Sequence, residues 1–334
     1  MSYDVAVIQG DGIGPEVVEA TIEVLNSTGL DFKWEYIDIM SLISEDLKKL
    51  PDEFLDIIIK NGRAIKGPIS TPLGSGYVSP NVLLRQQLGL YASLRPVKSV
   101  FKTGSLKPDT NIFVVRETTE DLYVMRENRD GDTASAEKFI SKEACIRIAR
   151  KAFEIAKKEN FSSVTALHKA DILKRTDGLF LECCRLVAEE KPDIRYSEAT
   201  IDSACTELIL DPTKFEVVVA PNMYGDIFSD VAAGLVGGLG LLGSANVGNG
   251  PTVYEAVHGS APNISGKGIA NPSGLITASV MMLRDIGEDM VAQAIEDSLY
   301  ELVNGSAVLT PDLGGNSKTK EFVEELKRLL QKRL

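Results

Sequence analysis

Short apolar runs alternate with helical patterns along most of this 334-residue chain, and this alternation constrains the fold more than any other feature. Residues 4–9 are an apolar run that ends in a glycine-rich turn, after which Pro15 begins a helical pattern with an apolar stripe. Further apolar runs occur in the segments 111–116, 162–168 and 215–220, and helical patterns occur in the segments 142–159 and 177–190. Strands that alternate with helices predict an α/β fold with a largely parallel sheet.

The glycine-rich turn resembles a dinucleotide-binding fingerprint but lacks its spacing. Gly10 and Gly12 match the first two glycines of the pattern GxGxxG, whereas Pro15 occupies the third position. We therefore interpret the turn as a tight connection between strand and helix, and not as evidence for a Rossmann fold.

Composition excludes several classes of function. The chain carries 48 acidic and 36 basic residues, and a net charge of −12 disfavours binding to nucleic acid or to an anionic membrane surface. Its 44% hydrophobic residues can build the core of one or two closely joined domains. The uncharged segment 231–254 is interrupted by glycines, which favours a close-packed loop region over a membrane helix.

The cysteines and the N-terminal residues predict a reducing compartment. The four cysteines have no metal-ligand spacing, so we expect buried free thiols. The N-terminal segment lacks the pattern of a secretion signal. The expected location is the cytoplasm.

Two carboxylates lie on one face of a predicted helix that begins near Met223. Asp226 and Asp230 are four residues apart, and their like charges would repel each other unless a cation lies between them. Mg²⁺ or Mn²⁺ would suit these oxygen ligands. The alternative is ordinary acidic charge near a helix N-terminus with both side chains in water. Spacing alone does not decide between them.

Three arginines are candidates for binding an anionic substrate. Arg85, Arg95 and Arg116 lie in two neighbouring segments, and Arg116 follows a predicted strand at the end where α/β folds bind ligands. Guanidinium groups match carboxylates bidentately, so together they suit a substrate with several carboxylates. Each arginine taken alone is equally compatible with a surface ion pair.

Three further residues could take part in chemistry. Lys169 follows a predicted strand and could accept a proton in a dry site, although solvent exposure is the simpler reading. Tyr123 could donate a proton, or could be a core tyrosine with its hydroxyl satisfied. Asp202 lies among small uncharged residues and could complete a metal site.

Long motifs in a fixed order extend along nearly the whole chain. They are GDGIGPE, LYASLRP, VRETTEDLY, HKADILKRTDGLF, NMYGDIFSDVAAGLVGGLG, HGSAPNISGKGIANP and TPDLGG. The chain thereby resembles the β-decarboxylating dehydrogenases, which act on isocitrate, 3-isopropylmalate, homoisocitrate or D-malate and tartrate. Its pattern is most similar to the NAD-type isocitrate dehydrogenases.

The resemblance implies a two-domain α/β fold of the isopropylmalate/isocitrate dehydrogenase type. The large cofactor-binding domain would comprise residues 1–97 and 238–334. The small domain, residues 98–237, would carry the dimer interface. The family arrangement implies a homodimer, or a dimer of dimers, in which each active site is completed by a second subunit.

The same resemblance assigns roles to the candidate residues. Arg85, Arg95 and Arg116 correspond to the carboxylate clamp. Asp226 and Asp230 correspond to metal ligands, with Asp202 supplied by the second subunit. Lys169, also from the second subunit, and Tyr123 correspond to the acid–base pair. The implied reaction transfers a hydride from C2 to the nicotinamide, releases CO₂ and reprotonates the resulting enolate.

The substrate segment, residues 66–85, favours isocitrate. Ser79 and Asn81 are polar where isopropylmalate dehydrogenases have an apolar patch, and in isocitrate dehydrogenases such groups hold the third carboxylate. Lys66 and Thr71 fit the same reading. The implied reaction is that of the tricarboxylic acid cycle, which yields 2-oxoglutarate. Homoisocitrate remains an alternative, because one methylene is discriminated by only about 1–3 kcal/mol.

The cofactor segments favour NAD. NADP-dependent bacterial relatives have Lys-Tyr at the positions of Asn263 and Ile264, and Tyr and Arg at those of Pro311 and Gly315. None of these phosphate-binding groups is present. The cofactor-binding residues implied by the resemblance are Thr71, Asn222, His258, Gly259, Ser260, Ala261, Asn263, Ile264, Asn271 and Asp312.

Three residues depart from the usual pattern. Asn263 replaces the usual aspartate and weakens the expected discrimination against NADP. Thr118 replaces an asparagine, and Asp171 adds a negative charge beside Lys169. A non-catalytic regulatory subunit is a rival from a different class, but such subunits typically lose metal or base residues. This chain retains Tyr123, Lys169, Asp202, Asp226 and Asp230.

Overall fold

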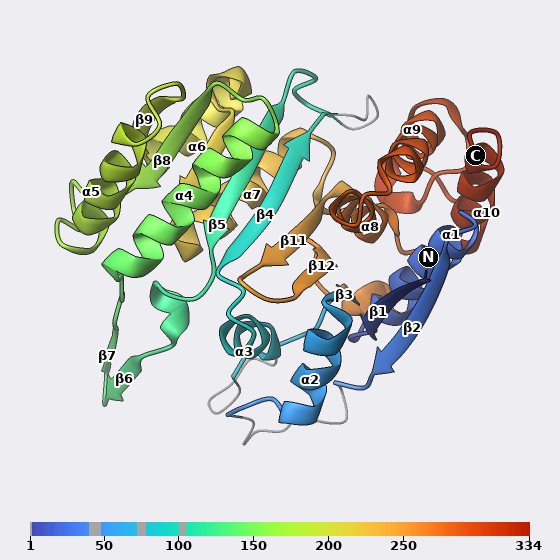
Figure 1. Ribbon diagram of the computed structural model, residues 1–334, viewed down its shortest axis with the longest axis horizontal. Helices are drawn as coiled ribbons and strands as arrows, with labels where there is room; N and C mark the ends of the chain where they lie inside the picture. The colour runs from blue at the N-terminus through green and yellow to red at the C-terminus, as the bar shows by residue number, and fades with distance from the viewer. Residues whose placement is uncertain (1, 40–47, 72–77, 100–104) are drawn as a thin grey trace.

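A ten-stranded mixed sheet runs through the whole molecule, with helices on both faces (Figure 1). The computed structural model describes residues 2–39, 48–71, 78–99 and 105–334. Within these residues the sheet order is β2-β1-β3-β12-β11-β4-β5-β10-β8-β9. Its strands are β1 (Ser2–Ile8), β2 (Asp31–Ile37), β3 (Arg63–Lys66), β4 (Ala92–Lys98), β5 (Asn111–Glu117), β8 (Ser163–His168), β9 (Arg195–Thr200), β10 (Val217–Ala220), β11 (Gly243–Val247) and β12 (Thr252–Ala256).

Both outer parts of the sheet are parallel, as the alternation of strands and helices predicts. Strands β2, β1, β3 and β12 pair in parallel, and so do β5, β10, β8 and β9. The centre is antiparallel, because β11 pairs antiparallel with both β12 and β4, and β4 pairs antiparallel with β5. The predicted α/β class is confirmed. The predicted domain boundary would fall between β4 and β5 in this order.

The helices begin and end close to the predicted positions. For example, the side chain of Ser141 caps the helix predicted from residue 142 by accepting a hydrogen bond from Ala144 N at 3.2 Å. The helices of the described residues are α1 (Gly14–Asn26), α2 (Asp52–Asn61), α3 (Pro80–Gln87), α4 (Lys142–Lys158), α5 (Thr176–Glu189), α6 (Ile201–Leu210), α7 (Asn222–Leu235), α8 (Ser273–Asp285), α9 (Asp289–Gly305) and α10 (Thr319–Leu330). None of the helices in these residues is both long and apolar enough to cross a bilayer.

Helices bury both faces of the inner part of the sheet, which explains why a strand such as β10 is continuously apolar. Val5 and Val7 of β1 pack in the same core as α1, whereas Ala6 and Ile8 pack with α2 on the other face. The chain ends thus meet in one half of the molecule, where α1 packs against α10 (Figure 1).

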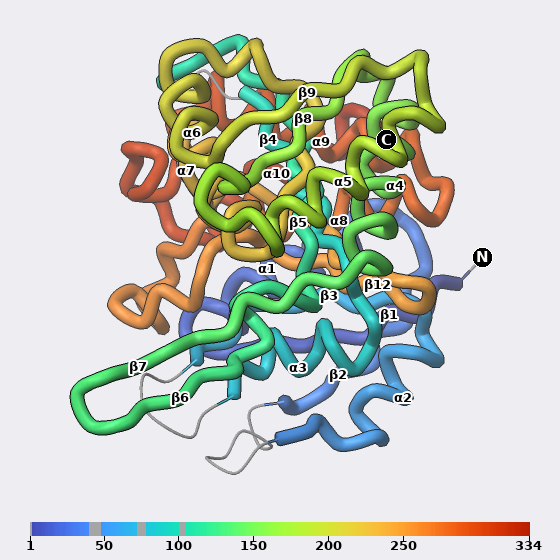
Figure 2. Tube along the Cα trace, turned by 90° about the vertical axis from the view of Figure 1, so that its left-hand side faces the viewer, coloured from blue at the N-terminus to red at the C-terminus, as the bar shows by residue number. Residues whose placement is uncertain are grey.

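The charged stretch 126–132 forms most of a hairpin that projects from the body (Figure 2). Its strands β6 (Glu127–Asp130) and β7 (Thr133–Ala136) pair with each other, and every residue in them is exposed. The charge of this stretch is typical of a solvated excursion or of a contact between subunits, and its exposure in a single chain is compatible with both.

Candidate active site

One cavity of about 230 Å³ brings most of the predicted substrate residues together. Its walls come from β3, the start of α3, β4, β5, α7 and the end of β12. Four basic side chains and two carboxylates face this space. The predicted residues that line it are Ser79, Asn81, Arg85, Arg95, Arg116, Tyr123, Asp226, His258 and Gly259.

Asp226 is the centre of a charged network at one end of the cavity. Its Oδ1 forms an ion pair with Arg95 Nη1 at 3.1 Å and a short one with Arg116. The hydroxyl of Tyr123 donates to its Oδ2 at 2.8 Å. Burial would raise the pKa of Asp226, but the charges of Arg116 and Arg95 outweigh burial and hold this pKa below its usual range.

Helix α7 fixes the position of Arg116 in two ways. Asn222 Oδ1 accepts hydrogen bonds from Arg116 Nε and Nη2 at 2.9 and 2.7 Å. Gly225, one turn later, lies so close that a Cβ atom there would be 2.8 Å from Arg116 Cβ. A glycine at this helical position is therefore required by the passage of the arginine side chain.

Asp226 and Asp230 converge, as their spacing on one helix predicts. Asp230 Oδ1 lies 3.6 Å from the same Arg95 nitrogen that contacts Asp226. Burial raises the pKa of Asp230, and the Asp226 carboxylate adds to this effect, while Arg95 opposes it. Asp226 and Asp230 side chains are 32% and 50% exposed, so both retain oxygens open to a hard cation.

The structure does not bring the whole predicted metal set together in one subunit. No cluster of three or more possible ligands from His, Cys, Asp and Glu occurs among the described residues. Asp202 instead pairs with Lys169 Nζ at 2.9 Å, and neither residue lines the cavity. Within one chain, α7 therefore supplies two of the three predicted metal ligands.

Lys169 is held as a cation in the isolated subunit. Hydrogen bonds to Asp202 and Asp171 raise its pKa, and its Nζ lies 3.1 Å from Asp171. The same pairing lowers the pKa of Asp202 to about 2. Asp171 thus contacts Lys169 directly.

Thr118, which also departs from the usual family pattern, is buried. It donates a hydrogen bond to the carbonyl of Leu90 at 2.6 Å, so its hydroxyl has a structural role.

Glu255 is a site residue that the sequence reasoning missed. It accepts from Lys66 at 2.6 Å, from Arg85 at 2.8 Å and from Asn246 at 2.7 Å. Burial would raise its pKa, but the charges of Lys66 and Arg85 outweigh burial and hold it far below its usual range. Arg85 is therefore already paired inside the protein. The sequence feature that could have revealed this role is an acidic residue inside the otherwise uncharged run of residues 252–257.

Ser79 and Asn81 differ in what they offer to a ligand. Ser79 Oγ accepts from Thr71 Oγ1 at 2.9 Å, which leaves its own proton available for donation. Asn81 Nδ2 donates to the Ile69 carbonyl at 3.0 Å. Asn81 Oδ1 is buried and has no hydrogen-bond partner in the part of the chain that the structure describes. The segment 72–77, within the predicted substrate segment, lies outside the described residues.

A second, larger groove of about 580 Å³ shares His258 and Gly259 with the substrate cavity. It gathers six of the residues predicted to bind the cofactor: His258, Gly259, Ala261, Ile264, Asn271 and Asp312. Thr71, Asn222, Ser260 and Asn263 do not line it. Asn222 is buried beside Arg116, and Asn263 is exposed on the short helix that also carries Ile264.

The groove has a fixed carboxylate and a tightly packed glycine loop. Asp312 accepts from Asn271 Nδ2 at 2.8 Å and from Thr310 Oγ1 at 2.6 Å. A Cβ atom on Gly12 would lie 2.0 Å from the carbonyl oxygen of Ser260, and its φ is +60°. The glycine-rich turn is therefore a close connection, as interpreted from the sequence, and it places the groove residue Ile13 against Ser260.

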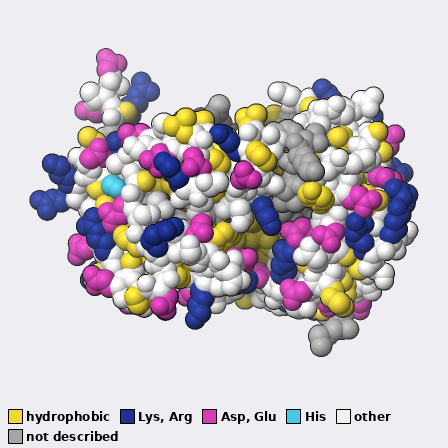
Figure 3. Space-filling view, turned by 90° about the horizontal axis from the view of Figure 1, so that it is seen from above, with side chains coloured by type: hydrophobic (Ala, Val, Ile, Leu, Met, Phe, Trp, Pro, Cys, Tyr) yellow, Lys and Arg dark blue, Asp and Glu magenta, His cyan; other side chains and the backbone are white. Residues whose placement is uncertain are grey.

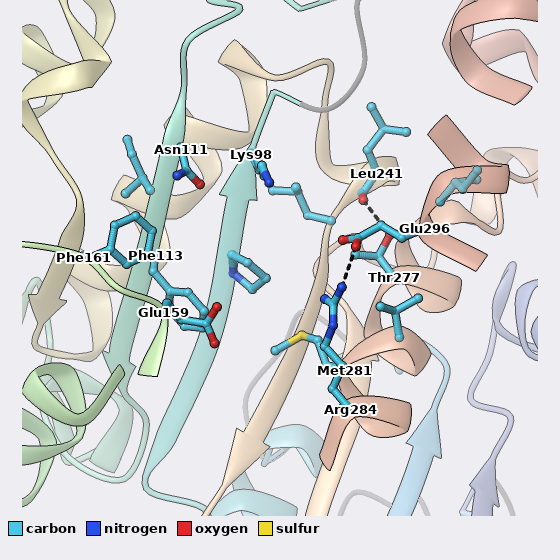
Figure 4. Close-up of a pocket in the computed structure, with 15 residues that line it drawn as sticks. Lys98, Asn111, Phe113, Glu159, Phe161, Leu241, Thr277, Met281, Arg284 and Glu296 are labelled. Carbon is cyan, nitrogen blue, oxygen red and sulfur yellow. Dashed lines mark hydrogen bonds and ion pairs between the residues drawn. The ribbon is translucent and has the colours of Figure 1, made fainter. Parts of the chain in front are cut away.

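A third cavity opens on the other face of the central strands (Figure 4). Pro96 and Lys98 line it, and they point away from Arg95 because successive side chains of a strand alternate. Its charged side chains include the ion pair of Arg284 with Glu296 at 2.6 Å. No predicted site residue lines it.

Figure 3 shows charged groups of both signs interspersed over the upper face of the molecule.

Comparison with known proteins gives consistent matches along the chain. The family model described as isocitrate/isopropylmalate dehydrogenase matches residues 4–326. The 3-isopropylmalate dehydrogenase of Archaeoglobus fulgidus is 45% identical, covering 98% of this chain and 99% of the relative. A mitochondrial NAD isocitrate dehydrogenase regulatory subunit from Dictyostelium discoideum is 44% identical, covering 96% and 90%. The crystal structure of isocitrate dehydrogenase from Methylococcus capsulatus superposes with a TM-score of 0.94 at 41% identity, covering 98% and 99%.

We predict opposite effects of alanine at two glycines of α7. Gly225→Ala places a methyl group against Arg116 and should lower the free energy of unfolding by about 1–3 kcal/mol. Gly234→Ala has open space around it and should raise this free energy by about 0.4–1 kcal/mol. Urea denaturation of both variants measures the difference. Equal stabilities would contradict the close packing of Arg116 on α7.

Glu255→Gln should destabilise the protein in a pH-dependent way. At pH 7 the variant leaves Lys66 and Arg85 buried without a counter-charge, which costs about 3–5 kcal/mol. Because the pKa of Glu255 is lowered by folding, its contribution is complete above its ordinary pKa of 4.5 and is lost as the pH falls. Urea denaturation at pH 7 and pH 4 should therefore show a smaller difference from the wild type at pH 4.

The exposed pair of Arg150 and Glu190 provides the control for this prediction. Glu190→Gln should change the free energy of unfolding by no more than about 1 kcal/mol at either pH. A Glu255→Gln variant that behaves like Glu190→Gln would show that the buried triad does not stabilise the fold.

Proposed function

The chain belongs to the isocitrate/isopropylmalate dehydrogenase family of decarboxylating dehydrogenases, and we propose that it oxidises isocitrate with NAD to 2-oxoglutarate and CO₂. The observation that carries this proposal is one cavity that combines Arg95, Arg116 and Tyr123 around Asp226 with Ser79, Lys66 and Arg85. Several cations and a free hydroxyl donor suit a substrate with three carboxylates.

The arginines divide into two groups by their partners. Arg95 and Arg116 contact Asp226, and a guanidinium has enough donors to bind a substrate carboxylate as well. Arg85 and Lys66 share Glu255, which reduces their net charge. We therefore assign two substrate carboxylates to Arg95 and Arg116, and the third to Ser79 with Arg85. Asn81, whose amide nitrogen is engaged with Ile69, positions the start of α3.

Asp226 and Asp230 would hold Mg²⁺ or Mn²⁺ together with Asp202 of a second subunit. Both α7 carboxylates are partly open, and a hard cation prefers such oxygen ligands. The ion supplies stabilisation of negative charge on the substrate oxygens. This arrangement requires a homodimer, or a dimer of dimers, with shared active sites. The four cysteines are free thiols, which is compatible with the proposed cytoplasmic location.

Tyr123 and Lys169 would handle the protons. Burial raises the pKa of Tyr123 above its usual value, so the phenol keeps its proton at neutral pH and can donate it to a carbanion. Lys169 of the second subunit would receive the hydroxyl proton as C2 is oxidised, which requires its neutral amine and therefore its release from Asp202 when that carboxylate binds the metal. NAD bound along the groove with Asp312 supplies the hydride acceptor. Asp312 adds a negative charge to this groove, which would disfavour a 2′-phosphate there and so favour NAD over NADP.

Three alternatives are compatible with the matched family. A relative that is 45% identical is named as a 3-isopropylmalate dehydrogenase, and homoisocitrate is close to isocitrate in size. Another relative is named as a regulatory subunit. Against the regulatory role, Tyr123, Arg95 and Arg116 still converge on Asp226 in one cavity.

Steady-state kinetics of the purified chain test the proposal. We expect the highest kcat/KM with isocitrate and NAD, and dependence on Mg²⁺ or Mn²⁺. The comparison acids are homoisocitrate, 3-isopropylmalate and D-malate, each with NAD and NADP. A higher kcat/KM with another acid would reject isocitrate. Lack of metal-stimulated NADH production with all four acids would instead support a regulatory subunit.

Ser79→Ala should lower kcat/KM for isocitrate by about 10- to 100-fold, because a hydrogen bond to a charged group is worth about 1.5–3 kcal/mol. D-malate lacks the third carboxylate and serves as the matched control. Its kcat/KM should change less than about threefold, since no bond to Ser79 is lost. Equal losses with both acids would refute the assignment of Ser79 to the third carboxylate.

A further inference from the structure

A largely buried lysine lies beneath two parts of the proposed catalytic machinery. Lys138 follows the β6–β7 hairpin, and its Nζ is 2.5 Å from Asp177 Oδ1 and 3.6 Å from Asp121 Oδ1. It also lies 4.3 Å above the ring of Tyr224. Its side chain is 10% exposed, and those of Asp121 and Asp177 are 1% and 0% exposed. Lys138 does not line the substrate cavity.

Asp177 connects Lys138 to Lys169. The second oxygen of Asp177 accepts a hydrogen bond from the backbone nitrogen of Lys169 at 2.7 Å. This bond holds the backbone at Lys169, the first residue after β8. The direction of the Lys169 side chain therefore depends on the position of a carboxylate that Lys138 holds.

Asp121 connects Lys138 to α7. Its Oδ2 accepts from the backbone nitrogen of Met223 at 2.9 Å, in the first turn of the helix that carries Asp226. Asp121 is also two residues before Tyr123, and its φ of +72° is unusual for a residue with a side chain. Its Oδ1 is buried without a hydrogen-bond partner among the described residues, so the ammonium of Lys138 is its close counter-charge.

Charge makes Lys138 necessary to both connections. Two buried carboxylates share this ammonium, and a buried carboxylate without a cation must take up a proton or move toward water. Either change would alter the bonds to Lys169 and Met223. Tyr224 of α7 is part of the same cluster, because its ring lies against the ammonium of Lys138.

We propose that Lys138 is a positioning residue that holds the Lys169 backbone and the start of α7 in place for catalysis. The inference rests on the proposed function, in which sites are shared between subunits. Each Lys138 then serves two sites: its own through Asp121 and α7, and the site of the partner subunit through Asp177 and Lys169.

The first experiment measures local order and kinetics in Lys138→Met, with Lys138→Arg as the conservative variant. Hydrogen exchange followed by mass spectrometry should show faster exchange of the Lys169 and Met223 amides in Lys138→Met. The kcat should fall by about 100-fold, as expected for catalytic groups displaced by about 1 Å. The KM for NAD should change less than threefold, because Lys138 is not in the cofactor groove. The kcat of Lys138→Arg should be at least tenfold higher than that of Lys138→Met.

Lys157→Met is the matched control, since Lys157 is an exposed lysine on α4. It should leave the exchange of both amides unchanged and kcat within twofold of the wild type. If Lys138→Met does not fold, Asp177→Asn replaces it, because this variant weakens the Lys169 connection and leaves Lys138 paired with Asp121. Unchanged exchange of the Lys169 amide in the deciding variant would overturn the proposal.

Hybrid dimers separate the two roles. Mixing Lys169→Met chains with Asp226→Asn chains should create one intact shared site per hybrid. Adding Lys138→Met to the Lys169→Met chain tests the connection to α7, and adding it to the Asp226→Asn chain tests the connection to Lys169. We expect at least a tenfold loss of hybrid activity in each case. If hybrid activity falls in neither case, the positioning role is refuted.

The parent hybrid distinguishes failure of this inference from failure of the proposed function. An inactive hybrid without any change at Lys138 would reject shared active sites. The exchange measurements on the homomeric Lys138 and Asp177 variants would still decide whether Lys138 orders the two segments.

Discussion

The site depends on buried cations whose charges are neutralised by carboxylates of the same chain. Arg95 and Arg116 are almost fully buried, and Asp226 lies against both. Lys66 and Arg85 depend on Glu255 in the same way. A buried charge without a partner is costly, so these pairs allow a cationic cavity to exist before any substrate binds. Because a guanidinium has several donors, it can then bind a substrate carboxylate while it keeps its bond to the carboxylate of the protein.

Helix α7 turns this charge balance into a defined geometry. Met223 binds Asp121 through its backbone, Gly225 allows Arg116 to pass, and Asp226 meets Tyr123 and both arginines. Because all these positions lie on one helix, a shift at its first turn would move every one of them. The bond of Asp121 to that turn therefore helps to set the position of the groups that face the cavity.

Local patterns in the sequence predicted much of this arrangement. The helical period placed Asp226 and Asp230 on one face, and the strand before Arg116 placed it at the cavity. Glu255 and Lys138 were missed because their roles come from partners far away in the chain, such as Arg85 and Asp177. Lys169 and Asp202 pair with each other outside the cavity, and no property of one chain brings them to Asp226. Their predicted roles depend on a second subunit.

The residues proposed for chemistry and those proposed for substrate choice come from different parts of the fold. Asp226, Arg116 and Tyr123 belong to α7 and to β5 with the segment after it, whereas Ser79 lies at the start of α3. A change near Ser79 can therefore alter the group that fits beside Arg85 without moving the proposed metal ligands or the proposed proton donor. This separation explains how relatives named for isocitrate and for 3-isopropylmalate can both be more than 40% identical to one chain. Under the proposed function, substrate choice is a local property of the α3 end of the cavity, and the reaction type depends on α7 and its buried supports.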